Sequence, residues 1–148
     1  MSRLAFLSPD ECAPEVVLDR SEPGKLEVRG EIGSLEAQAG EELLPLAPGR
    51  ALLVTDRPGA ARERLAADGF RVYDMSAALA TLEFDGEDLL RRLTELDPEQ
   101  LPAIGSIARG TPALIERRGG ERFRLYVPRE LGEYVGEVVA DLAQGLGR

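Results

Sequence analysis

The chain carries one short sequence pattern twice, and this internal duplication constrains its fold more than any other feature. Leu26–Gly30 (Leu-Glu-Val-Arg-Gly) matches Leu82–Gly86 (Leu-Glu-Phe-Asp-Gly) at an offset of 56 residues. An Asp-x-Ser triplet stands just upstream of each copy, at Asp19–Ser21 and at Asp74–Ser76. Each copy continues into a segment rich in Leu, Ala and Glu that we expect to be helical. A strand and a further helix then follow in both copies.

The repeated order of these segments predicts how the chain is organised. We expect one domain over residues 1–148, with two similar halves at about residues 16–70 and 71–145. A chain of this length can bury enough surface to form a core without a disulfide or a structural metal. The second half is longer, and we attribute the difference to an extra hairpin arm at residues 111–116.

Short apolar runs and polar–apolar alternation predict strands, over residues 25–29, 51–55, 70–73, 80–84, 112–116 and 122–127. The last two flank a Gly-Gly step and predict a β-hairpin. Apolar residues at helical spacing predict a helix from Leu131 to Leu142. We expect two more helices, one capped by Asp56 and one capped by Asp85 that carries leucines as far as Leu96.

Hairpins favour antiparallel sheets, and short helices interspersed with them favour a sheet covered by helices on one face. We therefore expect an α+β fold made of two ferredoxin-like, or split βαβ, halves.

The composition excludes several classes of function. Histidine is absent and Cys12 is the only cysteine, which excludes a Ser-His-Asp triad, a Cys-His pair, a disulfide within the chain and a structural zinc site. The net charge of −9 argues against binding to nucleic acid or to anionic membranes. No apolar run approaches the roughly 20 residues of a membrane span, and no secretory signal is apparent, so we expect a cytoplasmic protein.

The basic residues gather in one place. Residues 105–130 hold six Arg and three Glu, a local charge of +3. Arginine forks bind carboxylates and phosphates, so Arg109, Arg122 and Arg124 are the candidate residues for binding a cofactor anion. The alternative is a solvated hairpin with cross-strand Arg–Glu pairs. No residue is assigned a catalytic or metal-binding role.

Other reactive or ligand-binding side chains have ordinary structural interpretations. We expect Glu116 to face solvent from its strand. Tyr73, Tyr126 and Tyr134 are expected to pack in the interior, and not to stack on a ligand. The carboxylate pair Glu41–Glu42 is expected at an exposed helix start. Cys12 follows two acidic residues, which disfavour its thiolate, so we expect it to be inert.

The second half also resembles a known family. Tyr73–Ser76, Thr81–Gly86 and Asp88–Thr94 are similar to the amino-terminal folate-binding domain of the aminomethyltransferase (T-protein) of the glycine cleavage system. The family carries a functional Asp in its hairpin, whereas Gly110–Glu116 contains none. The resemblance therefore implies a fold but transfers no catalytic residue.

Over about residues 16–143 the chain resembles the gamma subunits of heterotetrameric sarcosine oxidase. The likeness rests on Leu18–Ser21, Gly24–Gly30, Val127–Arg129 and Tyr134–Val135. It implies a non-catalytic small subunit that packs on the large alpha subunit of an oxidoreductase acting on N-methyl amino acids. Tetrahydrofolate, FAD, FMN and NAD are then expected in the partner subunits, and none of them on this chain.

Two other functions remain open from the sequence. One is a free-standing folate-binding or aminomethyltransferase-like accessory protein, whose Arg-rich hairpin would hold the glutamate tail of folate. The other is an acidic adaptor of the same fold with a different partner.

Overall fold

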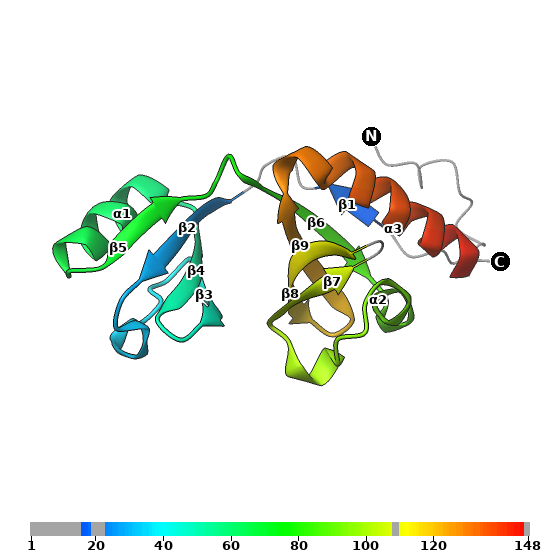
Figure 1. Ribbon diagram of the computed structural model, residues 1–148, viewed down its shortest axis with the longest axis horizontal. Coiled ribbons are helices and arrows are strands. Elements are labelled where there is room, and N and C mark those ends of the chain that lie inside the picture. Colours follow the sequence, from blue (N-terminus) through cyan, green and yellow to red (C-terminus); the bar gives the residue numbers. More distant parts are fainter. Residues whose placement is uncertain (1–15, 19–22, 108–109, 147–148) are drawn as a thin grey trace. The chain divides into compact units, whose positions relative to one another are not determined.

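The computed structural model describes residues 16–18, 23–107 and 110–146, and it contains two β-sheets and three α-helices (Figure 1). The chain divides into two compact units. What we call the first unit lies within Ser21–Leu79, and the second unit joins strand β1 (Val16–Leu18) to the chain from Ala80 onward.

The first unit is a four-stranded antiparallel sheet with the strand order β3-β4-β2-β5. Its elements are β2 (Gly24–Arg29), the 3-10 helix η3 (Ile32–Ser34), β3 (Glu41–Ala47), β4 (Arg50–Thr55), α1 (Pro58–Ala67) and β5 (Arg71–Asp74). Because β2 lies between β4 and β5 and is antiparallel to both, β4 and β5 are parallel. With α1 between them in sequence they form a split βαβ unit, and Leu26, Val28 and Leu53 pack against Ala61 and Leu65 of α1.

The second unit is a five-stranded sheet with the order β1-β6-β9-β8-β7. Its further elements are β6 (Leu79–Asp85), α2 (Glu87–Leu93), η4 (Pro98–Gln100), β7 (Ala103–Ile107), β8 (Thr111–Gly119), β9 (Arg122–Pro128), η6 (Arg129–Leu131) and α3 (Gly132–Leu146). Side chains of α2 and α3 share one hydrophobic core with the sheet, so both helices cover the same face. The core includes Leu82, Phe84, Phe123 and Val139, all fully buried.

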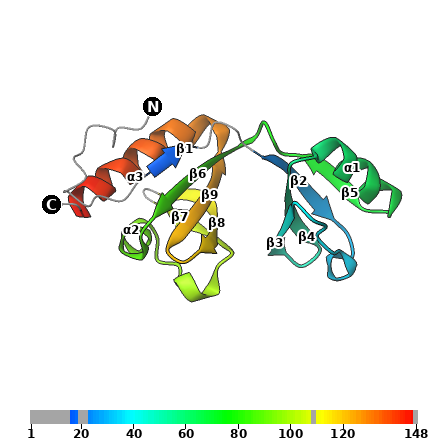
Figure 2. The same cartoon turned by 180° about the vertical axis from the view of Figure 1, so that it is seen from behind.

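The two units repeat one topology, and each takes one strand from the other repeat. The order β3-β4-β2-β5 in the first unit corresponds to β8-β9-β6-β1 in the second. Strand β1 begins the first repeat but pairs with β6 of the second unit, whereas β5 begins the second repeat but pairs with β2 of the first. Figure 2 shows, from behind, β1 beside β6 and β5 beside β2. Each repeat therefore supplies the edge strand of the other unit.

The duplicated motif forms the equivalent strands β2 and β6. Each copy ends in a glycine with a positive φ, 143° at Gly30 and 117° at Gly86, a conformation that favours glycine over every other residue. This shared backbone feature explains why both motifs end in the same residue.

The expected α+β class is confirmed, with antiparallel sheets, helices on one face and a split βαβ arrangement. Every strand predicted from the sequence is present, as are the three helices predicted by residue number, whereas β1, β3 and β7 were not foreseen. The predicted half boundaries at residues 70 and 71 differ from the unit boundaries, because β1 and β5 are exchanged. The single-domain expectation for residues 1–148 stays a prediction.

Three local expectations were wrong. The Leu-, Ala- and Glu-rich segment of the first repeat is not helical but forms β3, beginning at Glu41, because it pairs with β4 along its whole length. Asp85 does not cap α2, since its carboxylate binds Arg122 and Gly86 occupies the N-cap. Arg57, and not Asp56, is the N-cap residue of α1.

Close approach of β2 to the start of α1 leaves little room for a side chain at Gly24. A Cβ atom at Gly24 would lie 2.6 Å from Cγ and 2.7 Å from Cβ of Pro58, whose ring cannot rotate away. We predict that Gly24→Ala lowers the free energy of unfolding by about 1–3 kcal/mol, measured by urea denaturation. Gly33→Ala is the matched control, because its Cβ would meet nothing within 4 Å. Equal unfolding midpoints for the two variants would contradict this packing.

Candidate functional site

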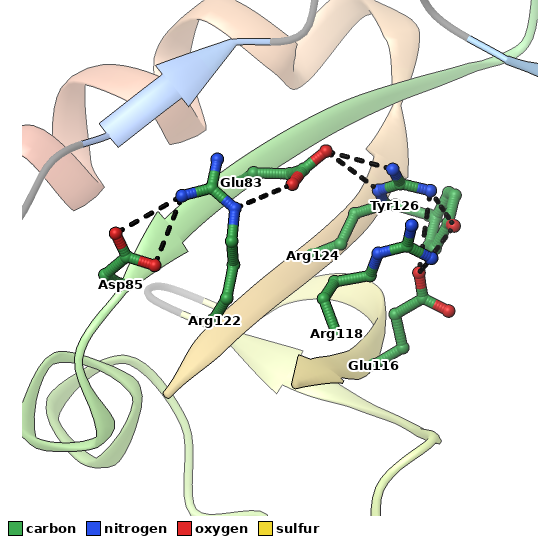
Figure 3. Close-up of polar contacts among 7 residues, drawn as sticks. All are labelled: Glu83, Asp85, Glu116, Arg118, Arg122, Arg124 and Tyr126. Carbon is green, nitrogen blue, oxygen red and sulfur yellow. Dashed lines mark hydrogen bonds and ion pairs between the residues drawn. The ribbon is translucent and has the colours of Figure 1, made fainter. Parts of the chain in front are cut away.

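A row of charged side chains lies on the face of the second sheet opposite α2 and α3 (Figure 3). Leu82 and Phe84 of β6 point into the helix-covered core, so the alternation of a strand puts Glu83 and Asp85 on the other face. The same alternation in β9 gives that face Arg122, Arg124 and Tyr126, between the core residues Phe123, Leu125 and Val127.

Glu83 binds both arginines of β9. Its Oε2 accepts hydrogen bonds from Arg124 Nη2 at 3.0 Å and Nε at 3.2 Å, and its Oε1 accepts from Arg122 Nε at 3.0 Å. Arg122 Nη1 also donates to both oxygens of Asp85 at 3.2 Å. The later acid on β6, Asp85, thus pairs with the earlier arginine on β9, Arg122, which is the order expected of antiparallel neighbouring strands.

The network continues inward from Arg124 to β8. Arg124 Nη1 donates to Tyr126 Oη at 3.1 Å, and Tyr126 Oη donates to Glu116 Oε1 at 3.0 Å. Glu116 Oε1 also accepts from Arg118 Nη1 at 3.1 Å. Glu116, Tyr126 and Arg124 are only 3%, 2% and 8% exposed. Removing one member of so buried a set deprives each neighbour of a hydrogen bond that water cannot readily replace, which is costly.

Four groups in this network have displaced pKa values: those of Arg122 and Arg124 are raised, and the other two belong to Glu83 and Tyr126. Burial alone raises the pKa of the Glu83 carboxyl, but hydrogen bonds from Arg124 and Arg122 outweigh it, so the pKa lies below its ordinary value. Burial, helped by the negative charge of Glu116, raises the pKa of the Tyr126 phenol. Glu83 is therefore held ionised and Tyr126 protonated at neutral pH, and neither state suits an exchange of protons with a substrate.

The structure brings two of the three candidate arginines together. Arg122 and Arg124 lie side by side, both engaged with carboxylates of the same chain, so an anionic ligand would have to displace Glu83 or Asp85. Arg109 lies outside the described residues. The expectation for Glu116 was wrong, because it is buried and bonded to Tyr126 and does not face solvent.

The expectation that all three tyrosines pack in the interior holds for Tyr126 but is wrong for Tyr73 and Tyr134. Tyr126 is buried as predicted, whereas Tyr73 and Tyr134 are 44% and 37% exposed, because they lie on an edge strand and on the outer side of α3. Cys12 lies outside the described residues.

Sequence reasoning missed the acidic half of the network. The local charge of +3 in residues 105–130 is balanced by Glu83, Asp85 and Glu87 from earlier in the chain, the last of which pairs with Arg117 at 3.1 Å. The signal was present in β6, where alternation with Leu82 and Phe84 places both acids on one face. Which strand lies next to β6, however, depends on the order of strands in the sheet, and local sequence does not reveal that order.

The first unit contains a reduced form of the same arrangement. Glu27 of β2 is equivalent to Glu83 of β6, and it accepts hydrogen bonds from Arg50 Nη2 at 2.9 Å and from Arg29 Nε at 2.6 Å. Leu52 and Val54 of β4 occupy the places that Arg124 and Tyr126 take in β9. The Glu–Arg pair is thus common to both units, whereas the buried extension to Tyr126 belongs to the second.

No metal centre or membrane span emerges from the part of the chain that the structure describes. It holds no cluster of three or more His, Cys, Asp or Glu side chains placed to bind a metal ion. None of its helices is long and apolar enough to cross a bilayer.

Neither a family model nor a curated protein matches the chain. Among solved structures it is similar to a chain of the heterotetrameric sarcosine oxidase from Corynebacterium sp. U-96, which was solved in complex with pyrrole 2-carboxylate. The TM-score is 0.76 and the sequence identity 19%, over 93% of this chain and 87% of the matched chain. The matched chain is therefore only slightly longer.

With a sequence identity of 19%, the structural similarity establishes the fold of the chain and nothing further. The chain has the two-sheet α+β fold of a small chain in a heterotetrameric oxidase. The resemblance stated from the sequence is confirmed at that level.

The Tyr126 hydroxyl links Arg124 to Glu116, so its removal tests the buried network. We predict that Tyr126→Phe lowers the free energy of unfolding by about 1–3 kcal/mol, because each neighbour loses a hydrogen bond without gaining water. Tyr134→Phe removes the same atom from an exposed site, and its effect should stay within about 0.5 kcal/mol. Chemical denaturation measures both, and an equally small effect of Tyr126→Phe would contradict the network.

The lowered pKa of Glu83 makes the ion pairs sensitive to acid. A carboxyl whose pKa is depressed by folding contributes stability above its ordinary pKa of 4.5, and this contribution is lost as the pH falls through the folded value. We predict that Glu83→Gln is less stable than the parent at pH 7, and that the two unfolding curves converge below about pH 4.5. Glu133→Gln, on the outer side of α3, should follow the parent throughout. A gap between Glu83→Gln and the parent that is constant with pH would contradict the ionised pairing.

Proposed function

We propose that this chain is a non-catalytic small subunit of a sarcosine oxidase-type flavin oxidoreductase complex. The observation that carries the proposal is the agreement of fold along 93% of the chain with a chain of almost the same length in a heterotetrameric sarcosine oxidase. The matched region makes up most of both chains, 93% of this one and 87% of the other.

The charged network supports a structural role. Every acidic group drawn in Figure 3 is bound by at least one arginine of the same chain. Proton transfer in catalysis needs a group that titrates near the working pH, whereas Glu83 and Tyr126 are displaced away from it in opposite directions. The chain also lacks histidine, the side chain that most often takes that role.

In this proposal the partner is the large alpha subunit of the complex, and flavin, NAD and tetrahydrofolate are bound by partner subunits. The substrate class is an N-methyl amino acid, which links the complex to one-carbon metabolism. The complex works in the cytoplasm, where a lone cysteine stays reduced. Stable heteromeric interfaces bury roughly 2,000 Å² or more, so association should persist through purification.

Co-expression tests the proposal. We expect a tagged form of this chain to co-purify with the large flavin-bearing subunit, and sarcosine-dependent oxygen consumption to occur in the complex but not with this chain alone. Failure to co-purify at about micromolar concentration, or turnover by the isolated chain, would contradict it. Titration calorimetry with tetrahydrofolate separates the free-standing alternative, for which the isolated chain should bind with a Kd of about 1 μM.

A further inference from the structure

Three arginines stand in one row across the sheet of the first unit. Arg29 of β2 is directly opposite Arg50 of β4 and directly opposite Arg71 of β5. Residues paired in this way share a face of the sheet. That face is opposite α1, because Leu26 and Val28 pack against α1 and Arg29 alternates with them. We call Arg29, Arg50 and Arg71 the arginine row.

A single carboxylate, that of Glu27, binds two of the three arginines of the row. Both oxygens of Glu27 are used, one by Arg50 and one by Arg29, and Glu27 is 7% exposed. The side chain of Arg71 makes no hydrogen bond or ion pair within the described residues, and both oxygens of Glu27 are already engaged. The row therefore carries a net charge of about +2 in a chain whose net charge is −9.

An exposed aromatic ring extends the row. Tyr73 of β5 is directly opposite Glu27, and the guanidinium carbon of Arg29 lies 5.0 Å from the centre of its ring. Tyr73 is 44% exposed, and the side chains of Arg29 and Arg50 are 40% and 44% exposed. Tyrosine and arginine are among the residues enriched where binding energy is concentrated in protein interfaces.

The duplicated fold provides an internal comparison. In the second unit the position equivalent to Arg29 is Asp85, which binds Arg122, the equivalent of Arg50. In the second unit the acid at this position neutralises the neighbouring arginine. In the first unit the arginine at the same position adds a further positive charge. Like charges placed directly opposite destabilise a sheet, so folding alone does not account for the arginine row.

We propose that the arginine row with Tyr73 is a docking site for an acidic segment of a partner polypeptide. Carboxylates of the partner would bind Arg71 and the unused guanidinium nitrogens of Arg29 and Arg50, and an apolar group would rest on the Tyr73 ring. A polypeptide fits better than a nucleic acid, because the strongly negative chain repels a phosphate backbone everywhere outside this small patch. The inference rests on the proposed function only in naming the large subunit as that partner.

The decisive variant is Arg71→Glu, since it should change stability and binding in opposite directions. An acid opposite Arg29 adds a favourable cross-strand pair, so the variant should unfold at the parent's denaturant midpoint or above it. Binding to the large subunit should weaken about tenfold or more at low salt, and the difference should shrink at about 0.5 M salt. Arg57→Glu is the matched control, an equal charge change at an exposed arginine beside α1, and its affinity should change less than about twofold.

A second probe separates this inference from the proposed function. If the parent chain does not bind the large subunit, the proposed function fails, and a peptide of ten glutamates then tests the site alone. Binding of that peptide by the parent and by Arg57→Glu, but not by Arg71→Glu, supports a polypeptide site if it persists in the presence of inorganic phosphate at equal concentration. Loss of the peptide to that phosphate would overturn the inference, because the site would then bind any small anion. Equal affinities of Arg71→Glu and Arg57→Glu for both probes would overturn the inference. So would dimers of the parent chain that Arg71→Glu abolishes, because the occupant would then be a second copy.

Discussion

Each sheet depends on an edge strand that comes from the other repeat. Strand β5 completes the first sheet by pairing with β2, and β1 completes the second by pairing with β6. A split βαβ unit has two parallel strands on either side of a central strand, and the edge strand is one of those two. The first repeat therefore lacks β5, one strand of the first unit, and the second repeat lacks β1, one strand of the second unit.

The central strands β2 and β6 carry the second common feature, a glutamate paired with an arginine of the next strand. From this shared pair the units have diverged. In the second unit Asp85, Arg124, Tyr126 and Glu116 extend it into a network of alternating partners that is buried at Arg124, Tyr126 and Glu116. In the first unit apolar Leu52 and Val54 replace the extension, and Arg29 replaces the acid. The charges of the network in the second unit are thus balanced internally, while the first unit exposes arginine donors that no carboxylate of the row binds.

The local sequence pattern was enough to predict the elements that pack a single apolar face against one core. The i, i+3, i+4 leucines and valines of α3 and the alternation in β2, β6 and β9 were all predicted, because each element has a single apolar face against its helix or sheet. It failed for β3, whose Leu43 and Leu44 face opposite sides and whose composition favours a helix. It also failed for the site, because the partners of Arg122 and Arg124 lie about 40 residues away in sequence, and only strand order brings Glu83 between them.

The central claim is that this chain acts as part of a larger oxidase and has no reaction of its own. Native mass spectrometry of the protein captured from its own cells tests it most directly. The account predicts that the 16.0 kDa chain appears in fixed stoichiometry within an assembly that also contains a flavin-bearing subunit. Recovery of the chain only as a free 16.0 kDa species, under conditions that keep other complexes intact, would contradict it.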